Sequence, residues 1–345
     1  MKYKVSVIVP IFNVEKYIER CAQSLFEQTL DDIEYIFVDD ASPDNSMTVL
    51  QTVIDRYPLR KDHVRIFRHE TNKGLPQARR TGIIAATGEY IQHVDSDDYT
   101  DTSMLEKLYK KAVDEDADIV MCDFFFKSEN EEELHIMNPY EIGLNGMKIR
   151  ENMIDGRIWP NVWSRLTKRE LYQQIPDKYY PVGNNAEDSV FTIVTAYYSQ
   201  KIAYLQEPLY YYWISNQSIT RLTTLERMIS NQYERKENTS VMARFLKDNG
   251  IYEKYYLAIV RHKSWGRNQL LYMLPNFRAW WTWMTLYPEL NWTIMFGNKH
   301  IHSGWNEKLW FAAIALGLYP KLNKYLLSKK YRPNIIWRSG CPCKK

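Results

Sequence analysis

The stretch "KVSVIVPIFNVEKYIERCAQSLFEQT", residues 4–29, combines two hydrophobic patterns. Residues 4–12 form a nearly continuous apolar and β-branched run, which is typical of a strand buried on both faces. From residue 13 onward the apolar residues repeat with the spacing of one helical face, and Asn13 suits the N-cap position. The stretch therefore predicts a buried strand followed by an amphipathic helix, which is the first unit of an α/β fold.

The same alternation of strand and helix continues to residue 126. Further strands are predicted at 33–40, 63–69, 89–95 and 117–126. Such alternation is typical of a doubly wound, mostly parallel sheet with helices on both faces. A tyrosine-rich strand and turn are predicted at 205–220, and residues 226–345 have the pattern of amphipathic helices.

The chain length and the distribution of charge predict two regions. A chain of 345 residues is too long for one ordinary core. Residues 1–225 contain 25 Lys and Arg against 35 Asp and Glu, whereas residues 226–345 contain 20 against 7. Eight of the 11 tryptophans also lie in the second region. We predict an α/β domain at 1–225 and a basic, tryptophan-rich helical region at 226–345, which either contacts an anionic surface or caps the α/β domain.

The sequence also indicates a compartment. Four scattered cysteines do not form the pattern of a disulfide framework. The N-terminus continues directly into a predicted strand, so we expect no secretory signal peptide. The longest apolar run of the C-terminal third, 309–319, has 11 residues, and a membrane span needs about 20. We expect a cytoplasmic protein, with peripheral contact to the inner face of a membrane as a further hypothesis.

Two acidic clusters follow two of the predicted parallel strands. Asp39 and Asp40 end the second strand, and Asp95, Asp97 and Asp98 end the fourth. Ligands of open parallel sheets bind beyond the carboxyl ends of the strands, so both clusters face one edge. Each cluster alone suits a solvated turn, but together they favour a shared site. Carboxylates this close raise one another's pKa, and a divalent cation such as Mn²⁺ or Mg²⁺ would compensate them.

Two arginines and a second acidic pair add to this set. Arg79 and Arg80 belong to the helix that precedes the fourth strand, and arginine is suited to phosphate recognition. Ordinary surface charge is the alternative, and it is favoured more for Arg80. Glu187 and Asp188 open a later helix, where carboxylates also stabilise the helix dipole.

Several common site motifs are missing from the sequence. No G-x-G-x-x-G follows the first strand, and there is no phosphate-binding G-x-x-x-x-G-K-[ST] loop. There is no G-x-S-x-G elbow, and the seven histidines do not have zinc spacing. The candidate site therefore consists of the carboxylates and the basic residues that are expected at the same edge of the sheet.

Four ordered segments resemble the successive signatures of family-2 glycosyltransferases with the GT-A fold. They are "VSVIVPIFNVEKYIERCAQSLFEQT", "YIFVDDASPDNS", "NKGLPQARRTGIIAATGEYIQHVDSDD" and "NAEDSVF". The resemblance covers about residues 4–220. It implies a GT-A α/β domain, a mostly parallel sheet and a mainly helical C-terminal region.

The resemblance also implies a role for each candidate residue. Contacts with a nucleotide-sugar donor fall on Pro10, Asp39, Asp40, Arg79, Asp95 and Ser96. Mn²⁺ or Mg²⁺ falls on Asp95, Asp97 and Asp98. Asp188 becomes the catalytic base, and Glu187 lies beside it on the acceptor side. Many relatives have Arg or His where this chain has Trp213, which removes one expected contact with the donor phosphates.

The implied reaction is the inverting transfer of one sugar to a hydroxyl of a glycan or lipid-linked acceptor, in surface polysaccharide synthesis. The donor class is a UDP-sugar, and the enzyme is a hexosyl- or N-acetylhexosaminyl-transferase. The Q-x-x-R-W motif of processive relatives is absent, which favours a single addition. We expect no nucleic-acid partner.

Two other interpretations remain open at this point. A metal-dependent nucleotidyltransferase also needs a metal and a nucleotide site, but it does not need the pair Glu187–Asp188. A non-catalytic sugar-nucleotide-binding protein does not need the metal-binding aspartates and a base together. A phosphatase with a D-x-D-x-[TV] motif fits less well, because its fifth position here is Tyr99.

Overall fold

The computed structural model describes residues 3–129, 132–135, 146–214, 224–274, 276–291, 312 and 315–317. The strands are β1 (Val5–Ile11), β2 (Ile33–Asp39), β3 (Val64–Arg68), β4 (Tyr90–His93), β5 (Tyr99–Thr100), β6 (Ile119–Lys127), β7 (Glu132–His135), β8 (Arg165–Lys168) and β9 (Ile202–Trp213). The helices of the α/β part are α1 (Ile18–Phe26), α2 (Ser46–Arg56), α3 (Pro58–Lys61), α4 (Leu75–Ala85), α5 (Met104–Glu115), α7 (Gly146–Ile154), α8 (Arg169–Gln173) and α9 (Glu187–Tyr198). The helices that follow are α10 (Leu225–Asp248), α11 (Tyr252–Asn268) and α12 (Phe277–Leu286).

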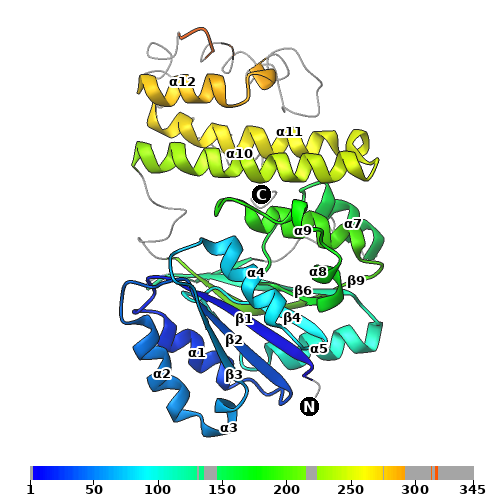
Figure 1. Cartoon of the computed structure of the whole chain (residues 1–345). Coiled ribbons are helices and arrows are strands. Elements are labelled where there is room, and N and C mark those ends of the chain that lie inside the picture. The colour runs from blue at the N-terminus through cyan, green and yellow to red at the C-terminus, as the bar shows by residue number, and fades with distance from the viewer. Residues whose placement is uncertain are drawn as a thin grey trace.

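One sheet organises the α/β part, as Figure 1 shows. Its strand order is β3-β2-β1-β4-β8-β6-β9-β5, and β7 pairs with the outer end of β6. β1 pairs in parallel with β2 and β4, and β2 pairs in parallel with β3. The predicted doubly wound, mostly parallel sheet is therefore confirmed.

The short strand β8 was not predicted. It lies between β4 and β6 and is antiparallel to both. Its four residues, "RLTK", are mostly polar and too few to show a strand period. They form a strand because the sheet supplies hydrogen-bond partners on both sides, which is a long-range effect that local propensity does not reveal.

The start of α1 also differs from the prediction. The helix begins at Ile18, and Asn13 has a positive φ of 57° in the preceding loop. The Asn13 backbone N–H donates to the Ser42 hydroxyl at 2.8 Å. Asn13 is therefore not the N-cap. Asparagine tolerates left-handed backbone, and here it turns the chain toward the loop that follows β2.

Two separate apolar layers cover the two faces of the sheet, because alternate residues of β1 point to opposite sides. Val5, Val7 and Val9 pack in one layer with α1, α2 and α5. Ile8 packs in the other layer with α4 and α9. A Cβ atom at Gly82 of α4 would lie 2.3 Å from the Ile8 side chain. Glycine at this position lets α4 approach β1 closely, which fixes the height of α4 above the sheet.

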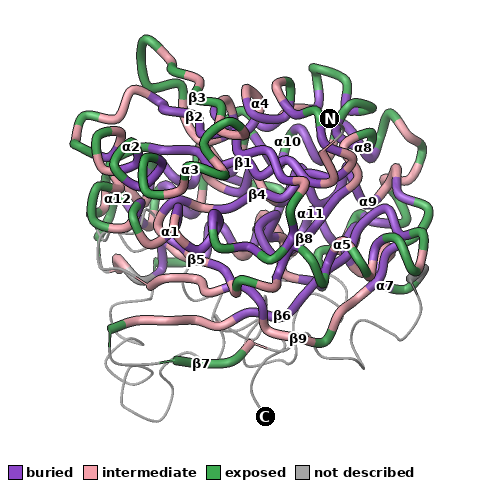
Figure 2. Tube along the Cα trace, turned by 90° about the horizontal axis from the view of Figure 1, so that it is seen from below, coloured by how far each residue is buried: buried purple, intermediate pink, exposed green. Residues whose placement is uncertain are grey.

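The helices α10 and α11 pack on the α/β part and lie above α9 in Figure 1. Apolar side chains of both helices, including Phe245 and Ile259, belong to the same buried cluster as Ile8 of β1. Figure 2 shows buried trace both in the central strands and in α10 and α11. The predicted division near residue 225 falls where α10 begins, and the side chains beyond it help to close the core.

The tryptophans of α12 differ in exposure. Trp283 is buried beneath the guanidinium of Arg267, 4.2 Å from its ring centre, whereas 55% of Trp281 is exposed. No helix within the described ranges is long and apolar enough to cross a membrane. The helix predictions that fall on residues 292–311 and 318–345 lie outside the described residues.

Candidate active site

A tight turn between β4 and β5 carries the three aspartates. The turn closes with a hydrogen bond from the Asp98 backbone N–H to the Asp95 carbonyl at 3.0 Å. Asp95 and Asp97 are partly exposed, whereas Asp98 and Ser96 are buried. The carboxylates of one short cluster therefore have different environments.

Asp98 connects this turn to β9. Its Oδ2 accepts a hydrogen bond from the Tyr210 hydroxyl at 2.7 Å, and its Oδ1 accepts one from the Trp213 backbone N–H at 2.7 Å. Burial, together with Asp97 and Asp95, raises the pKa of Asp98 well above its ordinary value. Both carboxylate oxygens have protein partners, so Asp98 holds the turn in place against β9. Trp213 contributes to it through its backbone.

Arg20 of α1 supports the same turn, and sequence reasoning did not single it out. Its Nη2 donates to the Asp97 carbonyl at 2.9 Å. Its guanidinium lies between the rings of Tyr99 and Trp213, 4.3 Å and 4.1 Å from their centres. Many relatives have a basic residue at the position of Trp213. Here the positive charge beside this position comes from Arg20, whose guanidinium contacts the Trp213 ring.

The turn suits a divalent cation only in part. No group of three His, Cys, Asp or Glu side chains that could hold a metal ion is found within the described ranges. Burial and the nearby Asp95 raise the pKa of Asp97 to about 7, which indicates negative charge without full compensation. Mg²⁺ is commonly held by one or two carboxylates together with water and substrate phosphates. Asp95 and Asp97 fit that donor set, and substrate would have to complete it.

Arg79 links this turn to the second acidic pair. It is 1% exposed. Its Nη2 donates to Asp95 Oδ1 at 2.6 Å, and its Nε lies 3.6 Å from Glu187 Oε1. Burial lowers the pKa of Arg79, but Asp95 and Glu187 outweigh burial and raise it. Arg80, by contrast, pairs with the exposed Asp177 on the helix surface.

Glu187 and Asp188 begin α9 immediately after Ala186, which has a positive φ of 67°. Burial and the adjacent Asp188 raise the pKa of the buried Glu187. Burial also raises the pKa of Asp188, which is partly exposed, and Arg79, Arg235 and Arg165 oppose this effect. A carboxylate whose pKa is raised toward neutrality is a better general base. The structure thus brings Asp188 to the same edge as Asp95 through Arg79.

Asp40 and Asp39 end β2 and have different partners. The Asp40 carboxylate accepts hydrogen bonds from the backbone N–H groups of Lys73 and Gly74, both at 2.8 Å, and lies 2.7 Å from His69 Nδ1. It therefore holds the loop that precedes α4. Asp39 accepts one bond from the Ser42 backbone N–H at 2.9 Å. Pro10 is buried in β1, opposite Val38 of β2.

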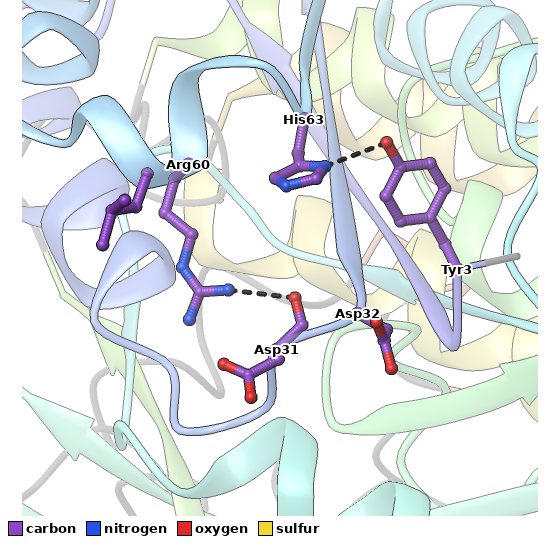
Figure 3. Close-up of a pocket in the computed structure, with 6 residues that line it drawn as sticks. Tyr3, Asp31, Asp32, Arg60 and His63 are labelled. Atoms are coloured by element: carbon purple, nitrogen blue, oxygen red, sulfur yellow. Dashed lines mark hydrogen bonds between the residues drawn. The ribbon is translucent and has the colours of Figure 1, made fainter. Parts of the chain in front are cut away.

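A separate pocket lies at the opposite end of the sheet. It is lined by Tyr3, Asp31, Asp32, Leu59, Arg60 and His63, which precede the first three strands. Figure 3 shows the Tyr3 hydroxyl bonded to His63 and Arg60 donating to the Asp31 carbonyl. The aspartates follow the carboxyl ends of β2 and β4, so this pocket is no part of their site.

The fold and the carboxylate edge define a GT-A α/β protein, and comparison with known proteins gives its family. The Glycosyl transferase family 2 model matches residues 6–181, which is just over half of the chain. The chain belongs to this family and is a glycosyltransferase. It is 34% identical over 243 residues to the uncharacterized glycosyltransferase EpsJ of Bacillus subtilis, which covers 67% of this chain and 68% of EpsJ.

Solved structures show the same fold. Residues 1–349 of S. aureus TarS, in complex with UDP-GlcNAc, superpose with a TM-score of 0.60 at 19% identity, over 93% of this chain and 87% of that one. The mannosyltransferase PcManGT of Pyrobaculum calidifontis, in complex with GDP-Man and Mn²⁺, gives 0.51 at 16% identity, over 94% and 88%. The predicted family, GT-A fold and enzyme class are therefore confirmed.

Replacing Arg79 with methionine should destabilise the protein strongly. The substitution leaves Asp95 and Glu187 near each other without their cation, and breaking a buried ion pair in this way costs about 3–5 kcal/mol. The matched control is Arg80→Met, one residue along the same helix, where a surface pair contributes about 0–1 kcal/mol. Urea unfolding of both variants measures the difference. Equal losses would contradict the central place of Arg79.

Proposed function

We propose that the protein transfers one sugar from a nucleotide-sugar, with a UDP-sugar as the donor class, to a hydroxyl of a glycan or lipid-linked acceptor, with inversion at the anomeric carbon. The observation that supports this proposal is the pair of contacts made by the buried Arg79, which joins Asp95 of the turn after β4 to Glu187, the neighbour of Asp188 at the start of α9. The UDP-GlcNAc bound to TarS supports a UDP-sugar, and the GDP-Man bound to PcManGT supports a nucleotide-sugar donor in general.

On the donor side, we assign contacts with the nucleotide sugar to Pro10, Asp39, Asp40 and Ser96, as the family resemblance implies, with the nucleoside base at Asp40 and Asp39. Asp39 is buried, accepts a hydrogen bond from the Ser42 backbone N–H and lies 3.6 Å from Arg68 Nε, so it too has protein partners. Asp40 shapes the site through the loop at Lys73 and Gly74.

The departing diphosphate needs positive charge, and Asp95 and Asp97 are the residues that would hold Mn²⁺ or Mg²⁺ beside it. The Mn²⁺ bound to PcManGT supports this choice. Such an ion, when bound, acts as a Lewis acid toward phosphate oxygens. Arg79 orients the Asp95 carboxylate through its hydrogen bond, and Arg20 fixes the backbone of Asp97.

On the acceptor side, Asp188 takes the proton from the attacking hydroxyl. Its partial exposure allows contact with an acceptor, and burial tunes its pKa toward neutrality. Glu187 is buried against Arg79 and orients this end of α9. A single base on the acceptor side fits one direct displacement, which inverts the anomeric centre.

We further propose that the enzyme is a cytoplasmic protein, peripheral at the inner face of the membrane, that acts in surface polysaccharide synthesis. Phe277 and Trp281 of α12 are exposed, and Arg278 lies between them in the sequence with an exposed side chain. Aromatic and basic side chains together suit the headgroup region of a bilayer. The net charge of residues 226–345, +13 from 20 basic and 7 acidic residues, adds attraction to anionic lipid.

A panel of sugar nucleotides, incubated with Mn²⁺ and candidate acceptors, tests the reaction itself. Release of UDP or GDP together with sugar transfer supports the proposal. Release of pyrophosphate from a nucleoside triphosphate would favour the nucleotidyltransferase. Nucleotide-sugar binding without any turnover would favour a non-catalytic binding protein.

Binding of UDP should depend on a divalent ion and on Asp97. With Mn²⁺ present, UDP at a hundred times its Kd should stabilise the native protein by about 2.7 kcal/mol, and thermal denaturation measures the rise in Tm. Asp97→Asn should abolish this rise, because it removes charge from the proposed metal site. Asp116→Asn is the control, since Asp116 is exposed and its left-handed backbone tolerates asparagine. A rise that is independent of metal and undiminished in Asp97→Asn would contradict the metal site.

Loss of the base should stop transfer and leave nucleotide binding intact. Asp188→Asn keeps the side-chain shape, removes its basicity, and should lower kcat by at least about a hundredfold. In the unchanged enzyme, kcat should fall as pH falls through the pKa of Asp188, because protonation removes the base. That limb should lie above the ordinary aspartate value of about 4, since burial raises the pKa. Transfer near the wild-type rate in Asp188→Asn would reduce Asp188 to a helix-terminal charge.

Membrane contact should depend on the exposed aromatic side chains of α12. The full-length protein should sediment with anionic vesicles at low salt, and Phe277→Ser combined with Trp281→Ser should weaken this at least severalfold. Leu59→Ser is the matched control, because Leu59 is also exposed but lies at the opposite end of the sheet. If the full-length protein stays in the supernatant with anionic and neutral vesicles, the helices act only as a cap.

A further inference from the structure

Helix α10 holds the loop that leads into the proposed base. Asn238 is 0% exposed and uses its whole amide group on this loop. Its Oδ1 accepts hydrogen bonds from the backbone N–H groups of Val182 and Gly183 at 2.8 Å and 3.3 Å. Its Nδ2 donates to the carbonyls of Gly183 and Asn185 at 2.6 Å and 2.9 Å. One side chain therefore satisfies four backbone groups of residues 182–185.

The contact between α10 and this loop is as close as two backbones allow. A Cβ atom at Gly183 would lie 2.7 Å from Glu234 Cβ and 2.8 Å from Glu234 Cα. On its other side the loop meets the start of α4, where Asn184 Oδ1 accepts a bond from the Leu75 backbone N–H at 2.8 Å. The loop is fixed from both sides, and neither anchor belongs to α9 itself.

A second side chain of α10, Arg235, faces the acidic pair. Arg235 is 6% exposed, and its charge opposes the rise in the pKa of Asp188. Its guanidinium lies 4.2 Å from the ring centre of Trp265 and 3.3 Å from His262 Nε2, and this same nitrogen lies 3.3 Å from the hydroxyl of Ser189, the residue after Asp188. A Cβ atom at Gly266 would lie 2.3 Å from Arg235 Cδ, so α11 leaves room for this arginine only because it has glycine there.

The start of α9 depends on such external anchors. Its N-cap residue, Ala186, makes no side-chain capping bond and has left-handed backbone. The direction in which Asp188 leaves the loop is therefore set by the residues that hold 182–185. A displacement of about 1 Å in a catalytic group can cost a hundredfold in rate.

We propose that Asn238 and Arg235 of α10 are positioning residues for the acceptor-side base: Asn238 fixes the loop 182–185 that aims Asp188, and Arg235 supplies a buried positive charge beside it. The C-terminal helical region is thereby part of the catalytic machinery. This inference rests on the proposed function of Asp188.

Asn238→Ala tests the loop anchor, and Asn231→Ala is its matched control. Asn231 is a buried asparagine on the same helix whose Oδ1 has no hydrogen-bond partner in the described part of the chain. Asn238→Ala should lower kcat by about 10–100-fold and change the donor KM by less than about twofold. Asn231→Ala should change neither. Equal effects of the two variants, or a loss of donor affinity that matches the loss in kcat, would reduce Asn238 to a structural residue.

Arg235→Gln and Arg235→Lys test the charge and stay informative if Asn238→Ala does not fold. The charged groups that face Asp188 are Glu187 on its own helix, Arg79 on α4, Arg165 on β8 and Arg235 on α10. Removing one positive charge disfavours the ionised carboxylate, so Arg235→Gln should move the acid limb of the kcat profile to higher pH. Arg235→Lys should restore most of the wild-type position. An unchanged limb in Arg235→Gln would overturn the part assigned to Arg235.

Asp188→Asn, measured in parallel, distinguishes a failure of the positioning proposal from a failure of the proposed base. If Asp188→Asn is inactive and the α10 variants behave like the wild type, the positioning proposal fails and the base stands. If Asp188→Asn retains transfer, the proposed function of Asp188 fails, and any effect of the α10 variants has another cause.

Discussion

The site depends on the ion pairs that the buried guanidinium of Arg79 makes with Asp95 and Glu187. A cation with 1% exposure would be costly in the interior, and it is stable there because Asp95 and Glu187 flank it. The reverse also holds, because Arg79 offsets the repulsion between these two acidic side chains. Arg79 occupies this position because Gly82, one turn further along α4, lets the helix pack directly on Ile8. The close packing of Gly82 on Ile8 in the core thus determines where the ion pairs of Arg79 form at the edge of the sheet.

The carboxylates of the edge fall into two groups with different tasks. Asp98 and Asp40 are buried and fully engaged with protein donors, so they hold the turn after β4 and the loop before α4. Asp95, Asp97 and Asp188 keep some exposure, and they are the ones available to a ligand. Such a division is physically reasonable, since a buried carboxylate needs hydrogen bonds and a reacting one needs access.

The two sides of the site are also joined through backbone contacts. Asp40 holds Lys73 and Gly74, Leu75 donates to Asn184, and Asn238 of α10 holds the loop around Asn184. These hydrogen bonds, formed by partly buried groups, connect the end of β2 with the C-terminal helices. Because α10 and α11 share a core with the sheet, their packing also determines the position of the loop from which α9 begins.

The sequence by itself determined the alternation of strands and helices as far as residue 126, the acidic clusters after two strands and the family, because these follow from local hydrophobic periods and from motifs that are contiguous in the chain. The run at 4–12 and the cluster at Asp95–Asp98 needed no partner to be recognised. The sequence did not separate Asp98 from Asp97, since one residue of spacing does not tell which carboxylate turns inward. Strand β8, the cation at Arg20 and the anchors Asn238 and Arg235 were decided only by the tertiary structure. Each of them depends on residues far away in the sequence that pack against it, and that packing supplies the hydrogen bonds and charges which give the residue its role.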